Sequence, residues 1–284
     1  MLTGSCLCGA IAFAVNGPVG SVGHCHCSMC RKSHGSTFAT FATVSTDDFR
    51  WVRGEERVVT YRSSALRSRR FCVRCGSAVL VDGDGERDVL VPLGNVAGDP
   101  GVRPRRHAFT ASMAPWHAIV DDLPRHDAHP QALGGPVVDR PTHPPKTPGA
   151  VGGSCLCGAV AYEFDRPPLR MYNCHCSRCR RAVSAAYQTV LRVRRSGFRW
   201  LAGADSVAGY RLPRTRFQCA FCRVCGSRTP WEREAQVCVP AGSLDGDPGE
   251  RPRCNIYTDS RAVWGALDER LESWPAGLTP DPDP

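Results

Sequence analysis

Cysteine is the residue of this chain whose spacing most directly indicates chemistry. The sequence of 284 residues contains 17 cysteines, and fourteen of them fall into short clusters that occur twice, about 150 positions apart. Thiolate sulfur is a preferred ligand of Zn²⁺, and closely spaced cysteine pairs supply the ligands of structural zinc sites. The duplicated clusters therefore predict a zinc-binding unit of roughly 125 residues that is present twice.

Two pairs of cysteines in each repeat together offer four ligands. In the first repeat, Cys6 and Cys8 lie in GSCLCG, where we expect the start of a strand, and Cys72 and Cys75 lie in FCVRCGS. Gly76 permits the positive φ of a Cys-x-x-Cys-Gly turn. Four thiolates form the closed tetrahedral set of a structural zinc. The second repeat offers the same set at Cys155, Cys157, Cys222 and Cys225.

A third cluster in each repeat has only three cysteines. Cys25, Cys27 and Cys30 form HCHCSMCRK in the first repeat. Three protein ligands with an open fourth position are the arrangement of a catalytic zinc, whereas a fourth protein ligand would make the site structural. The corresponding cysteines of the second repeat are Cys174, Cys176 and Cys179.

A nearby histidine is the alternative that would close the three-cysteine site. The candidates in the first repeat are His24, His26, His34 and His107. Three of them are replaced in the second repeat, by Asn173, Val183 and Asn255, and only His26 keeps a histidine counterpart, His175. This difference favours an open site, because a required ligand would have been lost from the second repeat.

Three further cysteines have no counterpart in the first repeat. Cys219, Cys238 and Cys254 are interpreted as free thiols, although Cys219 stands close enough to Cys222 to compete for its metal. A disulfide framework is the rival interpretation of the whole cysteine pattern. Cys-x-Cys pairs are difficult to bridge internally, which favours metal ligation.

The composition limits the setting in which the protein works. We find no secretory signal pattern at the N-terminus and no apolar run near the ~18 residues of a membrane span. Both observations predict a cytoplasmic protein without a membrane partner, and the reducing cytoplasm keeps clustered cysteines available as metal ligands.

The positive charge does not indicate nucleic-acid binding. The formal charge is +9, but fourteen thiolates and four Zn²⁺ ions would together lower it to about +3. Only Lys32 and Lys146 are lysines, and the arginines are spread along both repeats. No extended stretch interleaves basic with aromatic residues, as many nucleic-acid-binding surfaces do, so a nucleic-acid partner is not expected.

Similarity between the halves extends beyond the cysteines. Pro92–Arg105 matches Pro240–Arg253, and Trp116 corresponds to Trp264. Duplication of a folded unit explains a match of this length. The predicted divisions are repeat one at 3–125, a Pro-rich linker at 126–150, repeat two at 151–275 and a tail at 276–284.

The periodic segments are short and rich in Val, Phe and Thr, which predicts a mainly β fold with metal-bearing loops between strands. The expected strands are Ala10–Val15, Thr37–Val44, Val58–Arg62, Ala78–Val81 and Val89–Leu93 in repeat one, and Val160–Phe164, Tyr187–Val193 and Val237–Pro240 in repeat two. Helices are expected only after Cys30, after Cys179 and at Ala266–Ser273.

The motifs GSCLCG, CHCSxCR and FCxxCGS, followed by RPRxHxFxxSxAPW, resemble those of the glutathione-dependent formaldehyde-activating enzyme family, which includes centromere protein V-like proteins. The resemblance covers almost all of both repeats. It implies two tandem domains with a β-rich fold similar to the Mss4-like fold. It also implies up to four Zn²⁺ ions, one structural and one reactive in each domain, with the reactive ions held by the three-cysteine clusters.

The activity implied by the resemblance is that of a carbon–sulfur lyase. Formaldehyde, or a related carbonyl, and a small thiol such as glutathione would interconvert with the S-hydroxymethyl adduct. His107 of the late motif is expected on the substrate side of the open zinc. Repeat two has Asn255 at that position and Ser184 in place of Gly35, so we expect activity mainly in repeat one.

A binding module is the alternative from another functional class. Its zinc ions would only stabilise a surface for a protein or a nucleic acid, and it predicts a closed three-cysteine site. The enzyme instead predicts a concave pocket over an under-coordinated zinc. Sequence alone leaves both hypotheses open.

Overall fold

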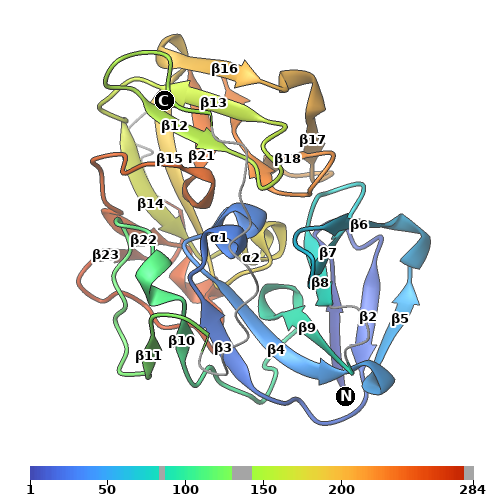
Figure 1. Cartoon of the computed structure of the whole chain (residues 1–284). Coiled ribbons are helices and arrows are strands. Elements are labelled where there is room, and N and C mark those ends of the chain that lie inside the picture. The colour runs from blue at the N-terminus through green and yellow to red at the C-terminus, as the bar shows by residue number, and fades with distance from the viewer. Residues whose placement is uncertain (83–86, 130–142, 278–284) are drawn as a thin grey trace.

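The computed structural model describes residues 1–82, 87–129 and 143–277. Within these residues the chain is mainly β, as predicted, and its two short α-helices, α1 (Ser28–His34) and α2 (Ser177–Val183), lie side by side at the centre between the sheets of both repeats (Figure 1). Both helices fall at the three-cysteine clusters, where helical turns were expected.

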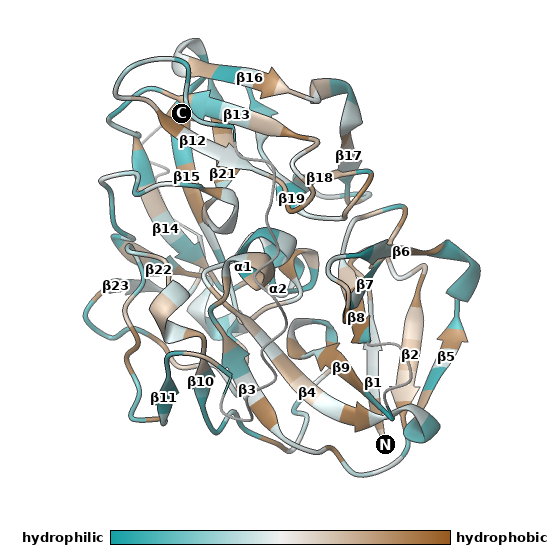
Figure 2. Cartoon of the chain, in the orientation of Figure 1, coloured by the Kyte–Doolittle hydropathy of each residue, from teal (hydrophilic) through white to brown (hydrophobic). Residues whose placement is uncertain are grey.

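The first repeat contains two sheets. In the smaller sheet the order of strands is β1 (Leu2–Ser5), β2 (Ala12–Val15) and β5 (Phe49–Arg53). In the larger sheet the order is β11 (Arg125–His126), β10 (His107–Ala108), β3 (Val22–Cys25), β4 (Ala39–Ser45), β9 (Asp88–Pro92), β8 (Ala78–Asp82), β7 (Ser68–Cys72) and β6 (Val58–Arg62). Hydrophobic segments are concentrated on β4, β8 and β9, which pack towards the core (Figure 2).

The second repeat has equivalent strands in three sheets. The first sheet contains β12 (Val151–Ser154), β13 (Ala161–Phe164) and β16 (Phe198–Ala202). The second contains β20 (Trp231–Arg233), β21 (Gln236–Pro240), β15 (Gln188–Arg194), β14 (Arg170–Cys174), β22 (Cys254–Ile256) and β23 (Glu272–Trp274). The third contains β17 (Val207–Arg211), β18 (Gln218–Cys222) and β19 (Arg228–Thr229).

A proline accounts for the extra sheet of repeat two. In repeat one, β8 pairs with both β7 and β9, which joins the two parts of the sheet. In repeat two, Pro230 separates β19 from β20 at the corresponding place, so that β19 pairs with β18 and β20 pairs with β21. Proline has no N–H to donate to a neighbouring strand, so a continuous strand cannot join the two sheets there.

All eight expected strands are present, with each end within two residues of the predicted position. Two other expectations were wrong. Ala266–Ser273 is not a helix but a turn that leads into β23. Cys6 and Cys8 are not at the start of a strand, because β1 ends at Ser5 and both cysteines lie in the loop before β2.

Each repeat contributes a tryptophan to the core of the other. Trp264 of repeat two is buried in the apolar cluster that contains Phe13 and Leu93 of repeat one. Trp116 of repeat one is buried in the cluster that contains Phe164 and Leu191 of repeat two. Burial of a large aromatic side chain contributes substantially to stability, so the two cores depend on each other.

Two glycines permit this close approach at equivalent places. A Cβ at Gly242, in the 3-10 helix η7 (Ala241–Ser243), would stand 2.3 Å from the Arg31 carbonyl oxygen at α1. A Cβ at Gly94, in η3 (Leu93–Asn95), would stand 2.2 Å from the Ala185 amide nitrogen just after α2. Backbone occupies both places, so no larger residue fits without separating the repeats.

The linker and tail are described only in part. Residues 130–142 of the expected linker and 278–284 of the tail lie outside the described residues. The end of the linker packs on repeat two, where Thr147 donates a hydrogen bond to Glu163 at 2.6 Å and His143 contacts the Gly158 carbonyl oxygen at 2.8 Å. In the described part of the chain, no helix has the length and apolar character needed to cross a membrane.

Candidate metal centres

The structure brings each set of four cysteines together. The Sγ atoms of Cys6, Cys8, Cys72 and Cys75 all lie within 4.8 Å of one another, with 3.5 Å between Cys6 and Cys8 and 3.8 Å between Cys8 and Cys72. Zn–S bonds of about 2.3 Å in a tetrahedron place sulfur atoms about 3.8 Å apart. The donor set therefore fits zinc. The corresponding site of repeat two contains Cys155, Cys157, Cys222 and Cys225.

Backbone amides donate hydrogen bonds to one sulfur atom of each four-cysteine site, as they commonly do to metal-bound thiolates. The amide of Ile11 donates a hydrogen bond to Cys6 Sγ at 3.3 Å, and the amide of Val160 does the same for Cys155 at 3.2 Å. Hydrogen bonds among the crowded thiols lower the pKa of Cys75 and raise that of Cys72, so in the absence of a metal these cysteines share protons. Gly76 adopts a φ of 67°, as expected for the turn that carries Cys75.

The three-cysteine clusters lie where a strand passes into a helix. Cys25 ends β3, Cys27 is the N-cap of α1, and the amide of Cys30 donates to Cys27 Sγ at 3.4 Å. The helix ends at Gly35, whose left-handed conformation at φ 63° stops the next turn. This strand–helix unit orients all three thiols to one point, with 3.5 Å between Cys25 and Cys27.

Within the described residues, no histidine or carboxylate joins the three cysteines of either repeat at ligand distance. His34 instead contacts the Val183 carbonyl oxygen through Nδ1 at 2.8 Å. His24, His26 and His107 belong to a separate group, because side chains alternate between the faces of β3 and these imidazoles face away from Cys25. The structure therefore does not bring His107 to the three cysteines.

A buried arginine that the sequence analysis did not single out lies beside the site of repeat one. Arg69 on β7 is 6% exposed, and its Nη2 donates to Cys30 Sγ at 3.5 Å. Its Nε and Nη1 are buried without a hydrogen-bond partner. Burial alone would lower the pKa of Arg69, but Cys30 and Cys27 raise it. A buried cation is stabilised by a neighbouring anion, so this side chain fits a cluster of metal-bound thiolates.

The three-cysteine site of repeat two has different neighbours. Cys219 occupies the position equivalent to Arg69 and packs with Cys72 and Cys75 of repeat one rather than joining Cys222. Cys174 and Cys179 pack in an apolar cluster. That cluster also contains Cys238, Cys254, Trp231 and Trp274. All three additional cysteines are therefore buried.

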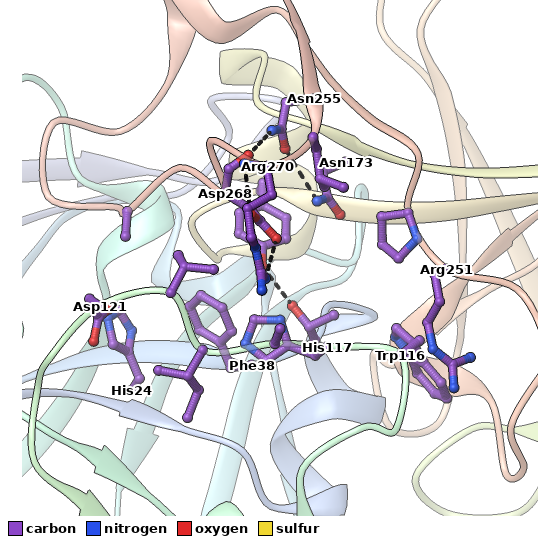
Figure 3. Close-up of a pocket in the computed structure, with 18 of the residues that line it drawn as sticks. His24, Phe38, Trp116, His117, Asp121, Asn173, Arg251, Asn255, Asp268 and Arg270 are labelled. Carbon is purple, nitrogen blue, oxygen red and sulfur yellow. Dashed lines mark hydrogen bonds and ion pairs between the residues drawn. The ribbon is translucent and has the colours of Figure 1, made fainter.

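A cavity lies between the repeats rather than over the three cysteines. It has a volume of about 230 Å³, and no cysteine of the clusters lines it (Figure 3). His24, Phe38 and His107 line it from repeat one, and Tyr187 and Asn255 line it from repeat two. Burial lowers the pKa of His24 to about 3, so its imidazole is neutral.

The fold and the sites define a duplicated, mainly β protein with clustered cysteines that can hold metal ions. The sequence profile of the glutathione-dependent formaldehyde-activating enzyme family matches residues 1–112 and 150–260. The chain therefore belongs to this family, as its motifs indicated, and the two matched segments agree with a tandem arrangement.

Two individual proteins are similar to parts of the chain. A Halomonas elongata protein named "Putative glutathione-dependent formaldehyde-activating enzyme" is 29% identical over 127 residues, which cover 42% of this chain and 81% of that protein. A crystal structure of a Rhodobacter sphaeroides protein has 27% sequence identity and a TM-score of 0.29, covering 36% of this chain and 92% of that chain.

Proposed function

We propose that the chain is a zinc-dependent carbon–sulfur lyase that interconverts formaldehyde and a small thiol with their S-hydroxymethyl adduct. The family supports a function related to formaldehyde and glutathione. The observation that carries the proposal is the set of three thiols at Cys25, Cys27 and Cys30, with no fourth protein donor among the described residues. A small thiol such as glutathione is the proposed partner.

The residues of repeat one would hold one zinc with an open position. When bound there, zinc supplies a site for the substrate sulfur and lowers the pKa of its thiol. Cys25 and Cys27 are partly exposed, so a small thiol would approach the cluster from the protein surface rather than through the cavity, which no cluster cysteine lines. The Arg69 guanidinium would stabilise the negative charge of the metal-bound thiolates. The four-cysteine sites would hold one structural zinc each, for up to four zinc ions per chain.

The reaction itself needs no redox cofactor. The sulfur electron pair forms a bond to the carbonyl carbon, the C=O π electrons move to oxygen, and the thiol proton ends on that oxygen. The reverse direction breaks the carbon–sulfur bond. The thiols must stay reduced for this chemistry, which agrees with a cytoplasmic location.

Turnover by cysteine variants tests this proposal. Adduct formation also proceeds without a catalyst, so exchange between free and thiol-bound ¹³C-formaldehyde should be measured by NMR with and without zinc-loaded protein. Cys27→Ser should remove most of the acceleration, whereas Cys176→Ser should remove less, because repeat two has Cys219 in place of Arg69. Ser112→Ala, at an exposed position outside the cysteine clusters, is the control.

The same experiment decides against the proposal if the wild-type chain gives no acceleration. A non-catalytic binding module would give this result and would bind added thiol no better than the Cys27→Ser variant. Equal loss from Cys27→Ser and Cys176→Ser would show instead that both repeats work.

A further inference from the structure

A second cluster of potential ligands lies on the opposite face of β3 from the cysteines. Parallel pairing of β3 with β10 places His24 beside His107, with 4.8 Å between the ring centroids. Asp121, from the segment between β10 and β11, places its Oδ1 2.9 Å from His107 Nε2. One ligand atom of each of the three residues lies within 4.8 Å of the others. In Figure 3, His24 and Asp121 lie next to each other at one end of the cavity.

A contact at Nδ1 orients the imidazole of both His24 and His107. Thr40 Oγ1 contacts His24 Nδ1 at 2.8 Å, and His26 Nε2 contacts His107 Nδ1 at 2.8 Å. Thr40 and His26 are both fully buried. Histidines that ligate a metal through one nitrogen are characteristically oriented by a hydrogen bond to the other. Here both imidazoles are oriented in this way, which leaves each Nε2 for a ligand.

We propose that His24, His107 and Asp121 bind a divalent transition-metal ion at the edge of the cavity. Two imidazole nitrogens and one carboxylate oxygen are a ligand set for Zn²⁺ or Fe²⁺. Adjacent nitrogen and oxygen ligands, each bonded to the metal at about 2.1 Å, stand about 3.0 Å apart in an octahedral site. The contact between His107 and Asp121 has this length, so the site needs little rearrangement. Positions not filled by the protein would face the cavity.

The neighbouring ring of His26 can accommodate a metal on His107. His26 is fully buried, and its Nδ1 has no hydrogen-bond partner. When His107 binds metal through Nε2, its Nδ1 carries the proton and donates to His26 Nε2. His26 then carries its own proton on Nδ1. The hydrogen bond between the rings is kept, and only the tautomers change.

Repeat two has two asparagines at the positions equivalent to these histidines. Asn173 and Asn255 occupy the positions of His24 and His107, and Asn173 Nδ2 donates to Asn255 Oδ1 at 3.3 Å. Asn255 Nδ2 in turn donates to the Asp268 carbonyl oxygen at 3.0 Å. The amides satisfy each other within the protein. The proposed site therefore belongs to repeat one alone, and it does not depend on the lyase activity proposed for the cysteines.

The test is a metal titration of the full-length chain with its cysteine sites already filled by zinc. Co²⁺ should bind one further equivalent with weak d–d absorption and no sulfur-to-cobalt charge-transfer band. Isothermal titration calorimetry and metal analysis after desalting give the stoichiometry. Cobalt that displaced zinc from cysteines would instead show the charge-transfer band.

Variants assign the additional equivalent to these residues. His24→Asn with His107→Asn reproduces the pair found in repeat two and should abolish it, as should Asp121→Asn. Thr40→Val removes only the partner of His24 and should weaken Co²⁺ binding about 10- to 100-fold. Asp122→Asn changes a neighbouring exposed carboxylate and should have no effect.

The outcomes separate this site from the cysteine chemistry. Unchanged cysteine-bound zinc in the variants shows that they are folded. No further equivalent in the wild-type chain overturns the proposal, and so does an equivalent retained by Asp121→Asn. Loss of formaldehyde exchange in Cys27→Ser, with Co²⁺ binding intact, would support both proposals separately.

Discussion

The two repeats build the same strand–helix unit around three cysteines and then surround it differently. In repeat one a buried arginine, Arg69, donates to Cys30. In repeat two Cys219 stands at the equivalent position, and the cysteines pack with Trp231 and Trp274. A duplicated ligand set therefore does not guarantee a duplicated function, because neighbouring charge and solvent access influence the chemistry of a bound metal.

The other face of β3 shows the same divergence. Repeat one has imidazoles at His24 and His107 beside a carboxylate, whereas repeat two has a self-satisfied pair of asparagines. The four-cysteine clusters, in contrast, are alike in both repeats. Both repeats thus keep the cysteines that would stabilise the fold, whereas the imidazoles and the carboxylate are found in repeat one.

The largest effect is expected from the four-cysteine sites. Cys72→Ser should unfold repeat one, because structural zinc contributes about 10–16 kcal/mol, as much as the whole stability of a typical domain. Since Trp264 belongs to the core of repeat one, we expect repeat two to lose stability as well. Zinc analysis and hydrogen exchange measured in each repeat provide the check.

Cys222→Ser should likewise unfold repeat two and destabilise repeat one. Cys254→Ser is the control outside both four-cysteine sites. A Cys72→Ser chain that keeps native exchange protection in repeat two would show that the repeats are energetically independent. A fully folded variant with its zinc retained would contradict the structural assignment of the site.

The next effect comes from the exchanged tryptophans. Trp116→Ala should lower the free energy of unfolding by about 3–5 kcal/mol, because it leaves a cavity in a well-packed core. Trp116→Ala should destabilise repeat two, where Trp116 is buried, and Trp264→Ala should destabilise repeat one. Urea unfolding combined with hydrogen exchange distinguishes the two. Val263→Ala, at an exposed position, should change little.

The smallest effect concerns the charge beside the three-cysteine cluster of repeat one. Arg69→Ala should weaken zinc binding at Cys25, Cys27 and Cys30 about 10- to 100-fold, as expected for a residue that supports ligands without binding the metal. Competition with a chromophoric chelator measures this affinity. Arg69→Lys should recover part of the loss because it keeps the charge. Arg70→Ala, which removes the neighbouring arginine paired with Asp82, is the control. Equal affinity in all variants would remove this distinction between the repeats.

Much of the fold was accessible from sequence patterns. The strands were predictable because β-branched and aromatic residues recur between Gly, Ser and Asp turns. The helix predicted at Ala266–Ser273 was wrong, since its last two residues, Glu272 and Ser273, belong to β23 and pair with β22. The loop position of Cys6 and Cys8 was also missed, because a tight hairpin and a strand start have similar local composition.

The duplication, the mainly β class, the family and the cysteine clusters were predictable from the sequence, because closely spaced ligands and repeats are local properties of the chain. Which distant residues meet depends on the tertiary structure. It placed Arg69 beside Cys30, His107 beside His24, and each tryptophan in the other repeat. These contacts depend on strand order, register and the packing of two cores, and no local pattern specifies them.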